Sequence, residues 1–149
     1  MDLIKIRPIG IIHSPYTSES KIPFQGIMSD IEFELLIYRE YIDGLKDIEG
    51  FSHLIVLYYA SNAKNLHLQT TTPWDTTLHG VFTTRSPFRP NFLLFSVVQL
   101  LKRKDEQTLL VKYLDAMDKT PLIDIKPYIP SLDRKEAVRI GWMTIKIKV

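Results

Sequence analysis

Short segments with the pattern of a β-strand recur along this chain, and no long helical period separates them. The clearest segment runs from Ile31 to Ile37, where apolar residues occupy every second position. This period of two places alternate side chains on opposite faces of an extended strand. Because the strands are not separated by crossover helices, we expect a mainly β protein, an antiparallel barrel or sandwich, with one or two short helices.

Seven or eight segments have the composition of strands. Residues 51–59 are apolar almost throughout, which predicts a central strand that is buried on both faces, and residues 92–101 predict a buried strand. Residues 38–45 predict a short helix that is closed by Gly44. The polar stretch 61–77 has no period and is expected to form a mobile loop over a site. The other expected strands are residues 4–12, with Pro8 at an edge or kink, 81–84, 108–115, 122–126, and a terminal strand 142–149 with one basic face.

The composition is that of an ordinary globular protein and selects no partner. The 149 residues are 45% hydrophobic and 24% charged, with a net charge of +2, which predicts one domain over residues 1–149. The absence of cysteine excludes disulfides, thiolate zinc sites and a cysteine nucleophile, and a cytoplasmic setting is the simplest expectation. The N-terminus lacks a secretory signal pattern. The longest apolar run, about ten residues, is too short to cross a bilayer, so no membrane partner is expected.

Several common active-site patterns are absent from the sequence. It contains neither GxGxxG nor GxxxxGK[ST], so a nucleotide-type ligand must be held in another way. Ser96 does not lie in the GxSxG turn of a serine nucleophile. The histidines have no metal-binding spacing, so no metal is expected. They are His13, His53, His67 and His79.

Two arginines lie in a proline-rich turn between apolar segments. Arg85 and Arg89 alternate there with Pro87 and Pro90. Arginine is always charged and presents a planar fork of donors, so a fixed pair can bind a carboxylate or another anion. Equally, this can be a surface loop whose arginines pair with nearby carboxylates.

Four aspartates follow in predicted turns, close to Tyr113, Tyr128 and Phe88. They are Asp115, Asp118, Asp124 and Asp133. Carboxylates in turns commonly cap backbone amides. The alternative is a site where an aspartate faces a cation or an exchangeable proton.

A basic run at residues 102–104 stands at an expected hairpin tip. Together with other basic residues it can hold a phosphate backbone, or it is simply a solvated tip and face. These residues are Lys5, Arg134, Lys135, Arg139, Lys146 and Lys148.

Five stretches together resemble one family in order and spacing. They are IGIIHSPY at 9–16, PFQG at 23–26, LKDIEGFSHLIVL at 45–57, GVFTTRSPFRPN at 80–91 and TPLIDIKPYIP at 120–130. These stretches are similar to the TrmO family, also called YaeB, TsaA-like or VirR-like. The resemblance covers roughly residues 5–130, and five motifs in register indicate homology.

The resemblance implies an S-adenosylmethionine-dependent methyltransferase built on a single antiparallel β-barrel. Such enzymes are homodimers with the cofactor site near the subunit interface. They methylate N6 of threonylcarbamoyl-adenosine at position 37 of tRNA.

The resemblance also implies candidate site residues. The positions matching the family's cofactor contacts are Gln25, Gly26, Ser61, Asn62, Arg85, Phe95, Tyr113, Leu114 and Asp115. Arg85 is expected to hold the carboxylate of the cofactor or of the substrate, while Arg89 supports the turn or the partner subunit. The hypothesis for the acceptor of the N6 proton is Asp115 or Asp118.

This chain departs from the family pattern at three places. Bulky residues at 92–95 replace a proline and a glycine, Ser61-Asn62 stands where a histidine followed by a polar residue is usual, and Lys119 replaces a turn glycine. Leu94 at the glycine position is expected to prevent close approach of the backbone to a ligand. The departures leave two further readings: a methyltransferase with another substrate, or a non-catalytic RNA-binding or dimeric interaction module.

Overall fold

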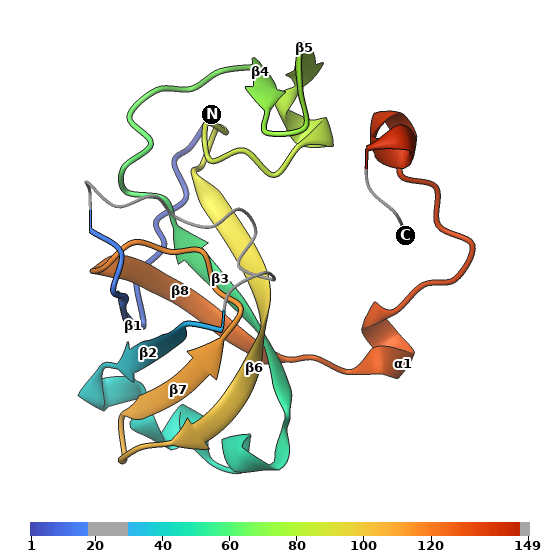
Figure 1. Cartoon of the computed structure of the whole chain (residues 1–149). Coiled ribbons are helices and arrows are strands. Elements are labelled where there is room, and N and C mark those ends of the chain that lie inside the picture. Colours follow the sequence, from blue (N-terminus) through green and yellow to red (C-terminus); the bar gives the residue numbers. More distant parts are fainter. Residues whose placement is uncertain (18–29, 147–149) are drawn as a thin grey trace.

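Six antiparallel strands close into a barrel in the computed structural model, which describes residues 1–17 and 30–146 (Figure 1). The strands are β1 (Gly10–His13), β2 (Glu32–Ile37), β3 (His53–Tyr59), β6 (Leu93–Arg103), β7 (Thr108–Lys112) and β8 (Thr120–Pro127). Around the barrel their order is β1-β2-β7-β6-β3-β8, and the last strand pairs with the first. The prediction of a mainly β antiparallel barrel is confirmed.

The barrel interior is filled by the alternate side chains that the period of two points inward. On β2, for example, Phe33, Leu35 and Ile37 are fully buried. The other fully buried side chains come from the remaining strands and their ends: Ile12, Leu54, Val56, Tyr58, Val98, Leu109, Val111, Leu114 and Leu122. A Cβ at Gly10 would lie 2.1 Å from the carbonyl oxygen of Leu36, so only glycine allows β1 and β2 to approach this closely.

Outside the barrel, a hairpin of β4 (Gln69–Thr72) and β5 (Asp75–Gly80) stands above β3 and β6 (Figure 1). The helical elements are short. They are the 3-10 helices η1 (Arg39–Leu45), η2 (Ile48–Gly50), η3 (Val81–Thr83) and η4 (Gly141–Ile145), and one α-helical turn, α1 (Pro130–Asp133). From α1 the chain leaves the barrel and returns toward the hairpin, so residues 134–146 form a C-terminal arm (Figure 1).

Three strand predictions were wrong. The first strand begins at Gly10 rather than at residue 4, since Pro8 has no N–H for the ladder and pairing starts with the bond from Ile9 N to Leu122 O. Residues 81–83 form the 3-10 helix η3. The predicted terminal strand is the 3-10 helix η4 over residues 141–145, because a closed barrel leaves no strand edge to extend, and residues 147–149 lie outside the described part.

Two other expectations need correction. The stretch 61–77, predicted to lack secondary structure, contains β4 and the start of β5, in keeping with the strand preference of its threonines. The runs 51–59 and 92–101 do contain strands, but β3 is not buried on both faces and β6 is not fully buried. Buried and half-buried residues alternate along β3, and on β6 Phe95 and Val97 remain 45% and 38% exposed.

Among the described residues, no helix is both long and apolar enough to cross a membrane. The same residues contain no group of three or more His, Cys, Asp or Glu side chains placed to hold a metal ion.

Candidate functional site

A cavity of about 1120 Å³ lies between the outer face of the barrel and the β4–β5 hairpin. Its floor is the outward side of β3 and β6, where Ile55 pairs with Val97 and Leu57 pairs with Phe95. Residues 70–74 of the hairpin form the opposite wall, and residues 84–89 close one side. At the other edge of the floor, Lys126 of β8 pairs with Ile55. The site is therefore an apolar strip with a cation on each side.

Arg85 lies over the floor of this cavity. Its guanidinium carbon is 5.0 Å from the centre of the Phe95 ring, a cation–π arrangement. Arg89 donates from Nη1 to the carbonyl oxygens of Thr84, at 3.2 Å, and Ser86, at 3.0 Å. Arg89 therefore holds the turn that presents Arg85, which is the supporting role predicted for it.

Asp115 is the carboxylate of the cavity, and it is held by two hydroxyl groups. The hydroxyl of Tyr58 donates to Oδ1 of Asp115, and Ser96 Oγ lies 3.5 Å from the same oxygen and 3.0 Å from the Tyr58 hydroxyl. Burial of Tyr58, followed by the charge and hydrogen bond of Asp115, raises the pKa of its hydroxyl far above the ordinary value. Tyr58 therefore stays protonated and orients the carboxylate.

Tyr113 and Leu114 precede Asp115 and have different positions. Tyr113 lines the cavity, and its backbone has a φ of 69°, in the left-handed region that few side chains adopt. Leu114 is fully buried in the barrel core, so its side chain supports the segment and does not contribute to the cavity wall.

A second cavity, of about 180 Å³, adjoins the first. The residues that line both cavities are Tyr58, Pro87, Phe88, Leu94 and Asp115. Asn62 lines only the smaller one, where its amide nitrogen contacts Met117 Sδ. Leu94 thus stands in the wall between the two spaces, at the position where the family pattern has glycine.

The structure gives the four aspartates two kinds of role. Asp118 accepts a bond from Ser14 N at 3.0 Å and lies 3.4 Å from His13 Nδ1. Asp124 and Asp133 accept from Ile125 N and Ile129 N, at 2.9 and 2.7 Å. These three cap backbone amides, and Asp124 Oδ2 also lies 2.8 Å from Lys126 Nζ, whereas Asp115 contacts the side-chain hydroxyls of Tyr58 and Ser96 in the cavity. The capping reading is therefore confirmed for Asp118, Asp124 and Asp133, and a functional role of Asp115 stays a prediction.

The Ser14 N–H, which donates to Asp118, is the main reason why the pKa of this carboxyl is below its usual value, and His13 lowers it further. Partial burial acts in the opposite direction.

Some of the predicted site residues line a cavity, and others do not. Arg85, Phe95, Tyr113 and Asp115 meet in the large cavity, and Asn62 lies in the adjoining one. Within the described part of the chain, Ser61, Leu114 and Asp118 line neither cavity. Gln25 and Gly26 lie outside the described residues. Lys119 adopts a φ of 66°, so the turn keeps its left-handed residue although glycine is replaced.

Sequence reasoning missed Tyr58, Trp74 and Lys126, and it considered Ser96 only as a nucleophile. Tyr58 is hidden in an apolar strand, and Trp74 in a threonine-rich stretch. Tyr58 and Ser96 are brought together by strand pairing, since Tyr58 of β3 pairs with Leu94 of β6, close to Ser96. The regular alternation of β3 would have placed Tyr58 on the inner face, but not beside an aspartate.

The basic run 102–104 forms part of the β6–β7 hairpin tip. Arg103 Nη1 lies 3.2 Å from Glu49 Oε1, and Lys104 pairs with Glu34. These local ion pairs on exposed side chains fit the solvated-tip reading of this run.

The fold and site define a class of protein: a small closed antiparallel barrel that holds a ligand-sized cavity on its outer face. The family model for the tRNA-methyltransferase O N-terminal domain matches residues 11–134. The chain therefore belongs to the TrmO family.

Similar proteins agree with this assignment. A probable S-adenosyl-L-methionine-binding protein of Archaeoglobus fulgidus is 49% identical over 95% of this chain and 38% of its own length. The tRNA (adenine(37)-N6)-methyltransferase of Escherichia coli is 34% identical over 87% of this chain and 60% of its own. The crystal structure of TrmO from Pseudomonas aeruginosa matches with a TM-score of 0.78 at 28% identity, over 95% of this chain and 63% of that one. The chain thus spans less than two thirds of each of these three proteins.

Proposed function

We propose that this chain is an S-adenosyl-L-methionine-dependent methyltransferase acting on N6 of threonylcarbamoyl-adenosine at position 37 of tRNA. The observation that carries the proposal is the cavity on the outer barrel face. Arg85, Phe95, Tyr113 and Asp115 line it together, and these are positions that match the family's cofactor contacts. The similarity to the S-adenosyl-L-methionine-binding protein of Archaeoglobus fulgidus supports the cofactor, and the similarity to the tRNA (adenine(37)-N6)-methyltransferase of Escherichia coli supports the acceptor.

The side chains of the cavity fit this cofactor in chemical kind. The Arg85 guanidinium can pair with a carboxylate, and the Asp115 carboxylate favours a nearby positive charge. The outer residues of β3 and β6 offer an apolar wall for an adenine ring. When bound, S-adenosylmethionine supplies a methyl group on a positively charged sulfur.

The residues of this chain contribute orientation and a proton acceptor. The hydroxyl of Tyr58 fixes one oxygen of Asp115, and we assign to this carboxylate the acceptance of the N6 proton. Asp118, the other candidate base, is engaged by the Ser14 N–H and lines neither cavity among the described residues. Most of the rate enhancement then comes from alignment of the two reactants in the cavity.

The proposal includes a homodimer in which residues 1–149 act as one domain, in the cytoplasm where tRNA is modified. Sedimentation of the pure protein tests the dimer. A single monomeric species at the concentrations used for catalysis would contradict that part.

The direct test is calorimetry with S-adenosylmethionine, followed by incubation with threonylcarbamoylated tRNA and mass spectrometry of the nucleosides. We expect cofactor binding and a mass increase of one methyl group on the modified adenosine. Absence of cofactor binding at millimolar concentration would overturn the proposal.

One observation favours an alternative. Leu94 stands in the wall shared by the two cavities and is bulkier than the glycine of the family pattern. If the chain binds RNA but not the cofactor, it is a non-catalytic RNA-binding module. Methyl transfer to a different acceptor, found by mass spectrometry, would indicate another substrate.

A further inference from the structure

The β4–β5 hairpin presents a tryptophan at its tip, on the wall of the large cavity. Thr72 pairs with Asp75, so Pro73 and Trp74 form the turn between the two strands. Both line the cavity, and the Trp74 side chain is half-buried. The hairpin is not part of the barrel ladder, so its position depends on other contacts.

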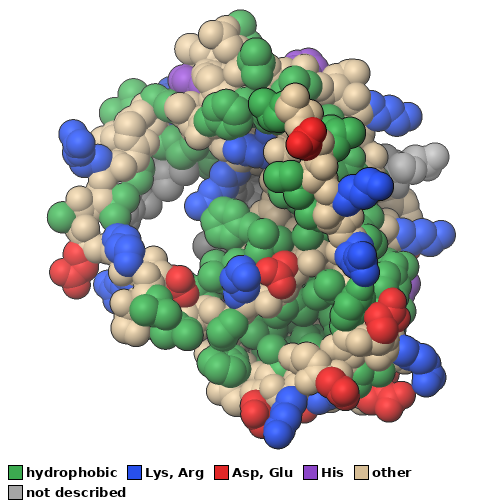
Figure 2. Space-filling model, turned by 180° about the vertical axis from the view of Figure 1, so that it is seen from behind, with side chains coloured by type: hydrophobic (Ala, Val, Ile, Leu, Met, Phe, Trp, Pro, Cys, Tyr) green, Lys and Arg blue, Asp and Glu red, His purple; other side chains and the backbone are tan. Residues whose placement is uncertain are grey.

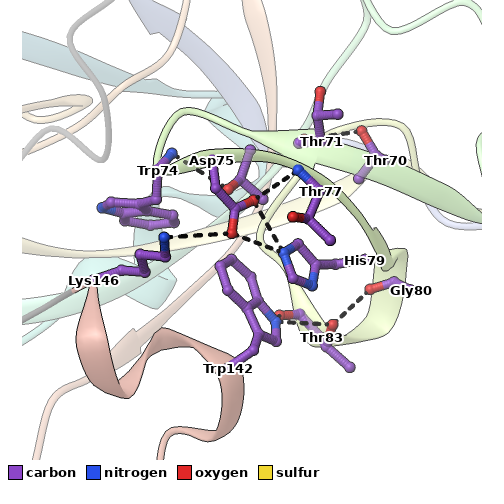
Figure 3. A network of polar contacts seen from close by, with 11 residues as sticks. Thr70, Thr71, Trp74, Asp75, Thr77, His79, Gly80, Thr83, Trp142 and Lys146 are labelled. Carbon is purple, nitrogen blue, oxygen red and sulfur yellow. Dashed lines mark hydrogen bonds and ion pairs between the residues drawn. The ribbon is translucent and has the colours of Figure 1, made fainter.

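The C-terminal arm supplies such contacts through Trp142, as Figure 3 shows. The Trp142 ring stacks on His79, with ring centres 3.7 Å apart and planes at 10°, and meets Trp74 edge-on at 6.3 Å. Its Nε1 donates to the carbonyl and hydroxyl oxygens of Thr83, each at 3.2 Å. The arm therefore contacts both the hairpin and the η3 segment that follows it.

A second set of contacts fixes the His79 ring. Its Nε2 lies 3.1 Å and 3.3 Å from the two carboxylate oxygens of Asp75, and Lys146 Nζ lies 3.9 Å from Asp75 Oδ2 (Figure 3). Trp142 and Lys146 lie beyond residue 134, where the match to the family model ends. The arm therefore supplies its half of these contacts from outside the matched domain, whereas the hairpin residues lie inside it.

The floor of the cavity faces the hairpin and suits a flat, apolar ring with an anionic chain attached. Phe95 and Val97 are partly exposed there, and Arg85 and Lys126 stand on either side of the strip, with Lys126 Nζ 2.8 Å from Asp124 Oδ2. Seen from behind, an opening separates the arm from the rest of the molecule, and Lys and Arg side chains border it (Figure 2). Aromatic side chains beside positive charges are the usual platform for single-stranded nucleic acid, because bases stack and phosphates pair with the cations.

We propose that Trp74 stacks on an unpaired base of the acceptor RNA, and that Trp142 is a positioning residue that holds Trp74 in place. This inference rests on the proposed function, because it assigns one end of the cavity to methyl transfer and the other end to the RNA acceptor. The end at Tyr58 and Asp115 serves methyl transfer, and the end at the hairpin tip and Lys126 receives the RNA.

The two tryptophans of the chain allow a direct test by fluorescence. The Trp142→Phe variant keeps Trp74 as its sole tryptophan, and the Trp74→Phe variant keeps only Trp142. The probe is an RNA hairpin with an unpaired adenosine in its loop, and the control is the same hairpin with an abasic position there. We expect the adenosine hairpin to quench the tryptophan fluorescence of the Trp142→Phe variant strongly and that of the Trp74→Phe variant weakly. The abasic hairpin should quench the fluorescence of Trp142→Phe less. Equal quenching of the tryptophan fluorescence of the two variants by the adenosine hairpin would overturn the inference.

Affinity gives an independent measurement. Trp74→Ala should raise the Kd for the adenosine hairpin roughly five- to 150-fold, the range that loss of one stacked base produces. Trp74→Phe should recover most of the affinity, and Trp142→Ala should weaken it in the same direction. Phe82→Ala is the matched control, since Phe82 is 73% exposed and lies outside the cavity lining. If Trp74→Ala binds RNA as the unchanged protein does, the stacking role is wrong.

The calorimetric Kd for S-adenosylmethionine separates this inference from the proposed function. We expect this Kd to be unchanged in Trp74→Ala, while the KM for RNA rises more than kcat falls. Methyl transfer with an unchanged KM in Trp74→Ala would overturn only the inference, whereas absence of cofactor binding in the unchanged protein would overturn the proposed function. If Trp74→Ala dissociates a dimer and leaves the RNA affinity intact, the hairpin tip contacts a second copy, and the inference is also wrong.

Discussion

The β2 wall of the barrel and the β3–β6 wall have the same inner face and opposite outer faces. Inward side chains such as Phe33 on β2 and Val56 on β3 are fully buried in one core. Outward, β2 carries Glu32 and Glu34, and Glu34 pairs with Lys104. The outward residues of β3 and β6 that line the cavity are apolar: Ile55, Leu57, Leu93, Phe95 and Val97. Apolar residues on both faces of a strand thus mark the cavity side of this barrel, whereas glutamates on the outer face mark the solvent side.

The largest expected effect contrasts a phenylalanine from each face. Phe33→Ala should lower the free energy of unfolding by about 3–5 kcal/mol, because it leaves a cavity in a core that packs around a fully buried ring. Phe95→Ala should cost less than about 1 kcal/mol, since its side chain is partly exposed, and should weaken cofactor binding instead. Chemical denaturation and calorimetry measure the two quantities. Equal losses of stability would show that the outer strip is ordinary core.

The next effect concerns the aspartate beside the apolar strip. Asp115→Asn should reduce kcat at least roughly 100-fold, because the amide cannot accept the proton that we assign to this carboxylate. Asp118→Asn is the matched control, three residues along the chain and outside the cavity lining, and should keep most of the activity. Single-turnover methyl transfer distinguishes the two. A fully active Asp115→Asn variant would remove Asp115 from the chemistry.

Asp118 should instead contribute to the pH dependence of stability. Its pKa is lower in the folded protein, chiefly through the Ser14 N–H, so its stabilising contribution is complete above the unfolded value near 4. That contribution should be lost as the pH falls from about 4 through the lower folded value. Denaturation curves between neutral and strongly acidic pH should show a shallower acid decline for Asp118→Asn than for the unchanged protein. An identical decline would mean that the cap does not stabilise the fold.

The smallest effect is expected on the solvent side of β2. Lys104→Ala removes an exposed ion pair with Glu34, and such pairs add little because water and salt screen them. The unfolding midpoint should not change measurably, and methyl transfer should continue at the same rate. A clear loss of RNA affinity in this variant would instead support the phosphate-binding reading of residues 102–104.

Strand positions were predictable where the pattern was local. The alternation in residues 31–37 gave β2 with its buried face, and residues 108–115 contain β7. The terminal segment had the same alternation, but its residues 142–145 lie in a 3-10 helix, because the closed barrel offers no edge and Trp142 docks on His79. Local period alone therefore cannot say whether a strand will find a partner.

The site was predictable in part, through the resemblance to the family. Arg85, Phe95, Tyr113 and Asp115 do come together in one cavity. Asp115 and Asp118 looked equivalent in sequence, yet one faces Tyr58 in the cavity and the other caps Ser14. The partners of these two aspartates come from segments distant in sequence, so no local sequence pattern could predict them.

By itself, the sequence determined the class of fold and the family, because the period of two and the order of five motifs are properties of the chain. It also determined which residue types are available for chemistry, with arginine and aspartate present and cysteine absent. Only the tertiary structure decided that the apolar faces of β3 and β6 form the floor of a cavity and that Trp74 and Lys126 lie around it. The physical reason is that a strand period fixes on which face a side chain lies, whereas what covers that face depends on the pairing register and on the return of the hairpin and the C-terminal arm.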